Sequence, residues 1–254
     1  MNASMEASME PSHGAEPTRE DCADGGASDM LRAMAITYLE SSRSMPLVRL
    51  PLRTSVIPLS RGRVLFAPAS TLSAERYREL EAEGEITDVV VPNLFHTEGV
   101  IPAAKAFPNA RLWAPVGIEK KKLDVRFHGT LGVDPWPHED ELSRITLGGM
   151  PSFAESVFVH RDTRTLVVAD LAFNVLDASG LGARMIFGLF GTYRRFGVSR
   201  LFLREVKDRP AFERSLAHLF EHDFDALAPA HGSVVEQGAK ELFRAALLER
   251  GCVV

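Results

Sequence analysis

The feature that most constrains the fold of this chain is the run ITDVVVP at residues 86–92. An almost unbroken series of β-branched residues is typical of a strand that is buried on both faces of a sheet. Other short apolar segments precede and follow it, and proline, glycine and charged turn residues separate them. The predicted strands are residues 47–50, 54–59, 63–67, 86–92, 111–114, 145–147, 156–160, 165–170 and 226–228.

Apolar residues at helical spacing lie between these strands, and Ser73 is a plausible N-cap for one of the predicted helices. The predicted helices are residues 30–39, 73–81, 100–107, 182–196, 210–221 and 235–250. Two sheet-rich halves, each flanked by helices, favour an α/β layered sandwich over a fully alternating doubly wound fold. The apolar run 181–191 contains Arg184 and is far shorter than a membrane span, so we expect a buried or half-buried helix there.

Residues 1–29 are small, polar and acidic, and they almost lack large apolar side chains. Such a segment cannot bury enough surface to offset the entropy of ordering it, so we expect a disordered tail. The remaining residues, 30–254, are few enough for one domain, which is the organisation we expect.

Charge and cysteine content exclude several classes of protein. The chain has 29 basic and 34 acidic residues, a net charge of −5, so no global positive field would attract nucleic acid. Cys22 and Cys252 lack metal-binding spacing, and the N-terminus lacks the basic and apolar regions of a signal peptide. We therefore expect a cytoplasmic protein that acts on a small molecule, with no nucleic-acid or membrane partner.

Candidate chemistry lies where three predicted strands end and loops begin, because a rigid sheet can position functional side chains there. The loop after the buried strand carries Asn93, His96 and Glu98, the strand 165–170 ends in Asp170, and His231 follows the short strand 226–228. Glu155 precedes another strand. Each residue also has a structural interpretation, as a turn or loop residue that forms local hydrogen bonds. His128, His138, His218 and His222 are predicted to be surface residues.

The segments GRVLFAPAS (62–70), TLVVADLAF (165–173) and ALAPAHG (226–232) resemble the strand ends of metallo-β-lactamase-fold hydrolases. The stretches 89–115 and 155–174 resemble, more narrowly, an uncharacterised branch of that fold that is classed as a domain of unknown function. The resemblance spans residues 47–249 and implies a four-layer αββα sandwich. It also assigns Asp170 to the metal-bridging aspartate and His231 to the last metal-binding histidine, so these are the predicted catalytic residues.

The chain departs from the metal-binding motif HxHxDH of that fold. Asn93, Phe95, Thr97 and Glu98 occupy the positions of the first histidine, the second histidine, the aspartate and the last histidine, and His96 is one position out of register. The turn before the hairpin, residues 149–153, has no histidine either. The motif is therefore degenerate, and a dinuclear centre is not expected.

A catalytic zinc usually needs three protein ligands and an open position. One zinc or other divalent ion held by His96, Asp170 and His231 meets this requirement, with Asn93, Glu98 and Glu155 as possible additional site residues. The chain would then be a metal-dependent hydrolase with a reduced or rearranged site. The alternative is a non-catalytic member of the fold that binds a ligand or a protein, in which Asp170 only fixes the tautomer of His231. No GxSxG, Walker or GxGxxG motif supports another chemistry.

Overall fold

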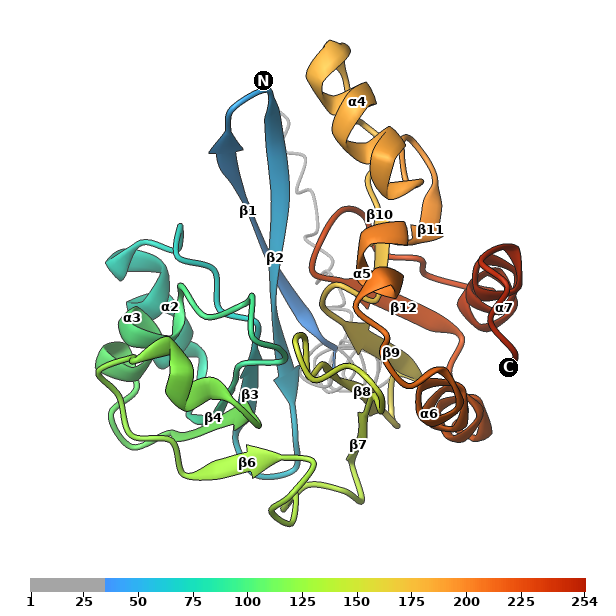
Figure 1. Ribbon diagram of the computed structural model, residues 1–254. Helices are drawn as coiled ribbons and strands as arrows, with labels where there is room; N and C mark the ends of the chain where they lie inside the picture. The colour runs from blue at the N-terminus through green and yellow to red at the C-terminus, as the bar shows by residue number, and fades with distance from the viewer. Residues whose placement is uncertain (1–34) are drawn as a thin grey trace, which may run out of the picture. The chain divides into compact units, whose positions relative to one another are not determined.

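A computed structural model of the chain describes residues 35–254 (Figure 1). The predicted tail, Cys22 and the first part of the predicted helix 30–39 lie outside the described residues.

The larger sheet has the strand order β1-β2-β3-β4-β5-β6. Its strands are β1 (Thr37–Met45), β2 (Val48–Pro58), β3 (Arg63–Phe66), β4 (Ile86–Val90), β5 (Arg111–Pro115) and β6 (Gly129–Leu131). The first three are antiparallel, whereas β3 to β6 are parallel. The helices α2 (Ala74–Glu83) and α3 (Val100–Ala106) supply the crossovers, and the Ser73 hydroxyl caps α2 by accepting from the Arg76 amide at 3.1 Å. A short 3-10 helix, η1 (Ile118–Lys121), follows β5.

The second sheet has the order β12-β9-β8-β7. Its strands are β7 (Leu142–Thr146), β8 (Ser156–His160), β9 (Thr165–Val168) and β12 (Ala226–Pro229), and β12 is parallel to β9. A separate antiparallel pair joins β10 (Ala172–Asn174) to β11 (Phe196–Val198). The helices in this half are α4 (Gly180–Phe190), α5 (Arg200–Arg204), α6 (Arg209–Glu221) and α7 (Ala239–Glu249).

Alternation of side chains along the strands builds the layers. In β8, Phe158 packs between the two sheets, whereas its neighbours Val157 and Val159 pack on the outer face with α6 and α7. In β3, Val64 and Phe66 point between the sheets and Leu65 packs with α2 and α3. The predicted four-layer αββα sandwich is thereby confirmed, with α2 and α3 on one side and α6 and α7 on the other (Figure 1).

Several predicted boundaries are wrong. Residues 37–39 belong to strand β1 rather than to a helix, and β2 is one strand that runs through Pro51. Pro51 is tolerated because β3 pairs only with residues 55–58 of β2, so the strand has a free edge at Pro51. The helix predicted over 182–196 ends at Phe190, where Gly191 adopts a left-handed φ of 74°. The helix predicted over 235–250 begins only at Ala239.

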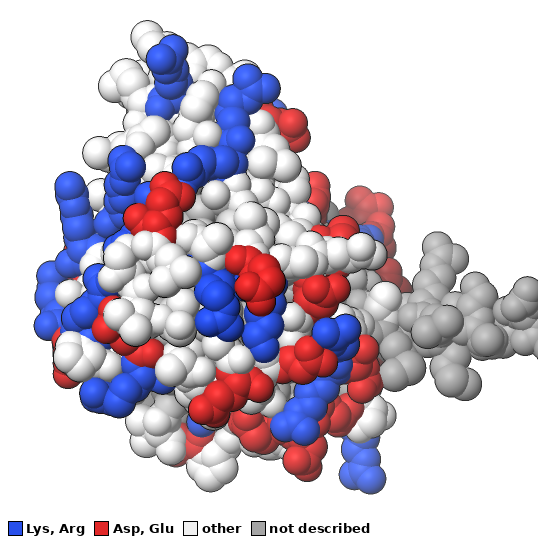
Figure 2. Space-filling model, turned by 90° about the vertical axis from the view of Figure 1, so that its right-hand side faces the viewer, with Lys and Arg blue, Asp and Glu red and all other residues white. Residues whose placement is uncertain are grey.

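Helix α4 buries less of its surface than expected. Ala183 and Phe187 are buried, but Leu181, Met185 and Leu189 are 75%, 59% and 57% exposed. Acidic and basic side chains are mixed over much of the face in Figure 2, whereas the top of that view, where α4 lies, is mainly uncharged and basic. None of the described helices is long and apolar enough to cross a membrane.

Candidate metal centre

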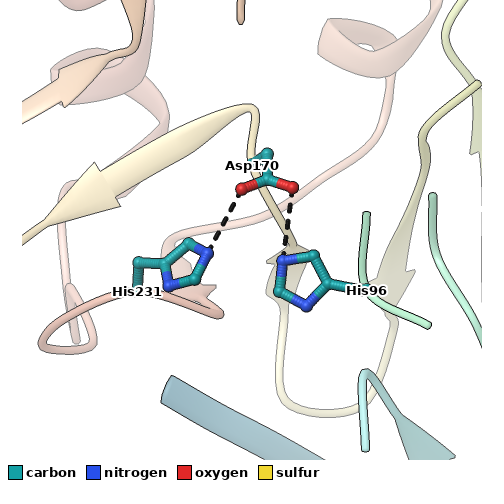
Figure 3. Close-up of side chains that lie close together, drawn as sticks. All are labelled: His96, Asp170 and His231. Carbon is teal, nitrogen blue, oxygen red and sulfur yellow. Dashed lines mark hydrogen bonds and ion pairs between the residues drawn. The ribbon is translucent and has the colours of Figure 1, made fainter. Parts of the chain in front are cut away.

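The parallel pairing of β9 and β12 brings Asp170 and His231 together. Val168 and Pro229 are partners in the ladder, and each is followed two residues later by one of these side chains. Because parallel strands run in the same direction, both side chains leave the sheet at the same edge. The Nε2 atom of His231 lies 3.2 Å from Oδ1 of Asp170 (Figure 3).

His96 reaches the same carboxylate from the other sheet. The side-chain oxygen of Asn93 accepts hydrogen bonds from the amides of Phe95 at 2.9 Å and His96 at 3.0 Å, which turns the loop after β4. The Nε2 atom of His96 is then 3.2 Å from Oδ2 of Asp170 (Figure 3). The two imidazoles therefore contact different oxygens of one carboxylate.

The three side chains form a compact set of metal-ligand atoms. One ligand atom each from His96, Asp170 and His231 lies within 4.8 Å of the others. His231 is buried, and His96 and Asp170 are only slightly exposed. Two imidazoles and one carboxylate are ligands that suit zinc, iron and other divalent transition metals.

The orientation of His231 fits a cation at this place. Its Nδ1 lies 2.9 Å from the carbonyl oxygen of Pro51, which can only accept, so Nδ1 carries the proton. In the neutral ring, the lone pair of Nε2 then points at the Asp170 carboxylate. That arrangement is favourable only when a proton or a cation lies between the two groups. Phe173 stacks on the ring, with centroids 4.8 Å apart, and holds it in this orientation.

Asn93 and Glu155, predicted as possible additional site residues, lie buried behind Asp170. The Asn93 amide nitrogen donates to Oδ2 of Asp170 at 2.8 Å and to Oε2 of Glu155 at 3.0 Å. Glu155 in turn accepts hydrogen bonds from three consecutive backbone amides, those of residues 169, 170 and 171. These contacts hold the Asp170 carboxylate in place, as supporting groups do around metal ligands.

Burial and ionic contacts shift the pKa of both carboxyl groups. Burial raises the pKa of Asp170, but the charge of His96 and the hydrogen bonds with His231 and His96 outweigh burial and hold it well below its ordinary value. Burial, followed by repulsion from Asp170, raises the pKa of Glu155. The N–H donors around Glu155 stabilise its charged form and oppose this rise. Asp170 is thus kept as an anion.

Glu98, the remaining predicted site residue, does not contact His96, Asp170 or His231 and instead lines the cavity above them. Its carboxylate pairs with Arg43 and accepts from the Ser70 hydroxyl at 3.2 Å. The cavity above the three side chains has a volume of about 160 Å³, and Arg43, Ser70 and Glu98 lie on its wall.

Sequence reasoning missed the residues that hold the His231 loop. The buried Arg53 guanidinium donates to the carbonyl of Pro229 at 3.0 Å and to that of Gly232, on either side of His231. Pro51 contributes only its backbone carbonyl. A proline and an arginine within a strand give no sequence signal of such contacts, because the partners lie far along the chain.

Comparison with known proteins identifies the fold. The profile of a family described as "Domain of unknown function (DUF4336)" matches residues 35–180. No curated protein matches the chain. Many solved structures do match it.

A metallo-β-lactamase from Pontibacter korlensis has 14% identity and a TM-score of 0.55, over 84% of this chain and 94% of its own. The enzyme FIM-1 from Pseudomonas aeruginosa, in its mono-zinc form, has 12% identity and a TM-score of 0.54, over 86% and 97%. A third, from Erythrobacter litoralis with β-mercaptoethanol in its active site, has 15% identity and a TM-score of 0.57, over 84% and 92%. At such identities the likeness establishes the fold alone, and the predicted metallo-β-lactamase fold is confirmed.

Proposed function

Because this chain belongs to the DUF4336 family and has the metallo-β-lactamase fold, we propose that it is a hydrolase that depends on one divalent metal ion. The metal would be held by His96, Asp170 and His231. The observation that carries the proposal is the convergence of their ligand atoms within 4.8 Å, with Nε2 of His231 facing Asp170. Zinc suits this donor set, which leaves coordination positions open for water and substrate.

The side chains present support one metal rather than two. Phe95 has no donor atom for a metal, and the Asn93 amide already donates to two carboxylates. Asn93 and Phe95 occupy the first two histidine positions of the dinuclear motif. Two of the ligands that a second metal would need are therefore missing. The FIM-1 enzyme in its mono-zinc form gives a precedent for one zinc in this fold.

A bound divalent metal would polarise a carbonyl or phosphoryl oxygen and lower the pKa of water toward ~7. The chain itself supplies orientation and charge. Asp170 is held as an anion by its hydrogen bonds, and Pro51 fixes which nitrogen of His231 faces the site. Phe173 covers one face of the His231 ring. A small-molecule substrate and a cytoplasmic location, both expected from the sequence, remain part of this proposal.

The competing function is a non-catalytic binding protein in which a protonated histidine replaces the metal. The 3.2 Å contacts of Asp170 with both imidazoles suit that state as well. Metal analysis distinguishes the two functions. Protein purified without chelator, supplied with zinc and freed of excess, should retain about one zinc per chain.

Asp170→Ala and His231→Ala should each lose that zinc, because only two ligands would remain in either variant. His218→Ala is the matched control, since His218 is an exposed histidine on α6. Sub-stoichiometric zinc that neither site substitution alters would contradict the proposal. The zinc-loaded protein should also hydrolyse an activated ester such as p-nitrophenyl acetate, and chelation should abolish that activity.

A further inference from the structure

Asp170 also lines a second cavity, of about 450 Å³. Phe95 and Asp170 line both this cavity and the smaller one above the metal centre. The walls of the two cavities differ in character. Arg43, Ser70 and Glu98 place polar groups on the wall of the smaller cavity, beside apolar residues that include Leu50 and Leu52. Five phenylalanines and Leu201 form most of the wall of the larger cavity, and its polar residues are Asp170, Ser199, Arg204 and Glu205. We call the larger cavity the aromatic groove, and its apolar side chains are Phe95, Phe153, Phe173, Phe190, Leu201 and Phe202.

The rings of the aromatic groove form a connected wall that starts at the metal centre. Phe173 stacks on His231 and meets the edge of Phe190 of α4 at a centroid distance of 5.8 Å. On the other side, Phe95 stacks on Phe153 at 4.3 Å, and Phe153 meets Phe202 of α5 at 4.9 Å. An apolar surface therefore extends from the site of the proposed chemistry to helices α4 and α5.

The groove is not simply unfilled core. Phe95 is 57% exposed at its entrance, although it follows the buried strand β4. Leu201 is half-buried and belongs to none of the hydrophobic clusters, whereas its neighbours Phe202 and Leu203 pack in the core of the second sheet. Phe95 and Leu201 thus expose apolar surface to a concave space, which is typical of a ligand-binding surface.

We propose that the aromatic groove binds the apolar acyl chain of the substrate, so that the protein hydrolyses esters of medium-chain acids. This inference rests on the proposed function. Asp170 and Phe95 line both cavities, so a molecule that extends across the metal centre would place an apolar part in the groove and a polar part beside Arg43 and Ser70. The ester bond is where these two parts join.

Hydrolysis of such an ester consumes one water. The bond between the acyl carbon and the alcohol oxygen breaks, the water oxygen stays on the acyl carbon, and a water proton passes to the alcohol oxygen. The products are a fatty acid and a polar alcohol. No oxidant, reductant or further reactant is required.

The first test is a series of p-nitrophenyl esters from acetate to octanoate with the zinc-loaded protein. Each methylene that enters the groove should raise kcat/KM by up to about fourfold, the gain expected from burying one CH₂. Leu201→Asp places a carboxylate in the groove without disturbing the core, and it should remove this dependence on chain length. Leu189→Asp is the matched control, since Leu189 is exposed on α4 and does not line the groove.

The second test needs no metal and no reaction. The fluorescent fatty acid cis-parinaric acid should bind the chelator-treated protein, and Leu201→Asp should weaken binding at least tenfold while Leu189→Asp leaves it unchanged. Binding of this probe without hydrolysis of any ester would support the groove and refute the proposed function. Hydrolysis of the acetate ester with neither probe binding nor a chain-length trend would refute the groove alone. A dimer that Leu201→Asp dissociates would also overturn the inference, because a second copy would then occupy the groove.

Discussion

The Nδ1 atom of His231 lies 2.9 Å from the carbonyl oxygen of Pro51, although 180 positions separate the two residues. Two residues further along β2, Arg53 binds the carbonyls of Pro229 and Gly232. One strand therefore holds both the loop that carries His231 and the tautomer of its ring. Because these contacts involve no metal, the ligand is oriented before any metal binds, which lowers the entropic cost of binding.

Zinc should stabilise the folded protein, because the three ligands converge only in the native state. At a free zinc concentration of about 100 times Kd, the stabilisation is about 2.7 kcal/mol, or about 5–10 °C in Tm for a domain of this size. Differential scanning calorimetry with and without chelator measures it. The shift should vanish in Asp170→Ala and persist in His218→Ala. An equal shift in Asp170→Ala would mean that zinc binds elsewhere.

Asn93 should contribute to stability and to zinc binding through the hydrogen bonds that its side-chain amide nitrogen donates. Asn93→Ala removes the donor shared by Asp170 and Glu155 and also the acceptor for two loop amides, which should lower the free energy of unfolding by about 1–3 kcal/mol. It should also weaken zinc binding by about 10-fold to 100-fold. Urea unfolding and zinc titration measure the two effects.

Asn93→Asp keeps an acceptor for the loop amides but places a third carboxylate beside Asp170 and Glu155. Without zinc it should therefore be less stable than Asn93→Ala at neutral pH. If the two variants were equally stable, the role of the amide as a donor between carboxylates would be wrong.

Local patterns predicted much of the fold. The hairpin of β8 and β9 and the buried strand β4 follow from runs of apolar residues bounded by turn residues, and Ser73 caps α2 as expected. Strands β10 and β11 were missed because three residues are too few for a period to be visible. The helix predicted over 182–196 wrongly included Phe196, the first residue of β11. Helix propensity alone does not show that the helix ends before Gly191.

Some residues of the candidate site could likewise be predicted from local patterns, and others could not. Asp170 and His231 could be singled out because each is a polar residue at the end of an apolar strand, but their proximity depends on the register of β9 and β12, a long-range pairing that no local pattern encodes. His96 could not be placed from a motif that is one residue out of register. His138 was predicted to be a surface residue, yet it contacts the buried carboxylate of Asp88. The aspartate within the run of residues 86–92 was the available signal of a buried polar network.

Asp88 should make stability depend on pH at the acid end. Burial raises its pKa, but hydrogen bonds from His138, Arg111 and Trp113 outweigh burial and lower the pKa from 3.8 to about 2. Because the folded-state pKa is the lower one, the ionised group stabilises the fold at pH values above about 4. That contribution is lost as the pH falls from about 4 through 2.

The difference in unfolding free energy between the wild type and Asp88→Asn should therefore shrink by about 2 kcal/mol over this interval. Urea unfolding at pH 2 to 7 measures it. Asp124→Asn, at an exposed position in the loop after η1, is the control for general acid effects. A difference that does not change with pH would mean that the charge of Asp88 contributes nothing.

Gly182 should control how the hairpin of β1 and β2 packs against α4. A Cβ atom at Gly182 would lie 1.9 Å from the carbonyl oxygen of Leu47, at the tip of the hairpin, so the backbone itself would have to move. Gly182→Ala should therefore separate the tip from α4 and speed hydrogen exchange of the amides near Leu47.

Gly188, in the same helix, has nothing within 4 Å of the equivalent position. Gly188→Ala should instead stabilise the protein by about 0.5–1 kcal/mol, because alanine favours a helix over glycine. The same residue change at two positions of one helix should thus have opposite signs in thermal unfolding, and destabilisation by both would indicate that helix propensity and packing are not the terms that decide the stability of α4.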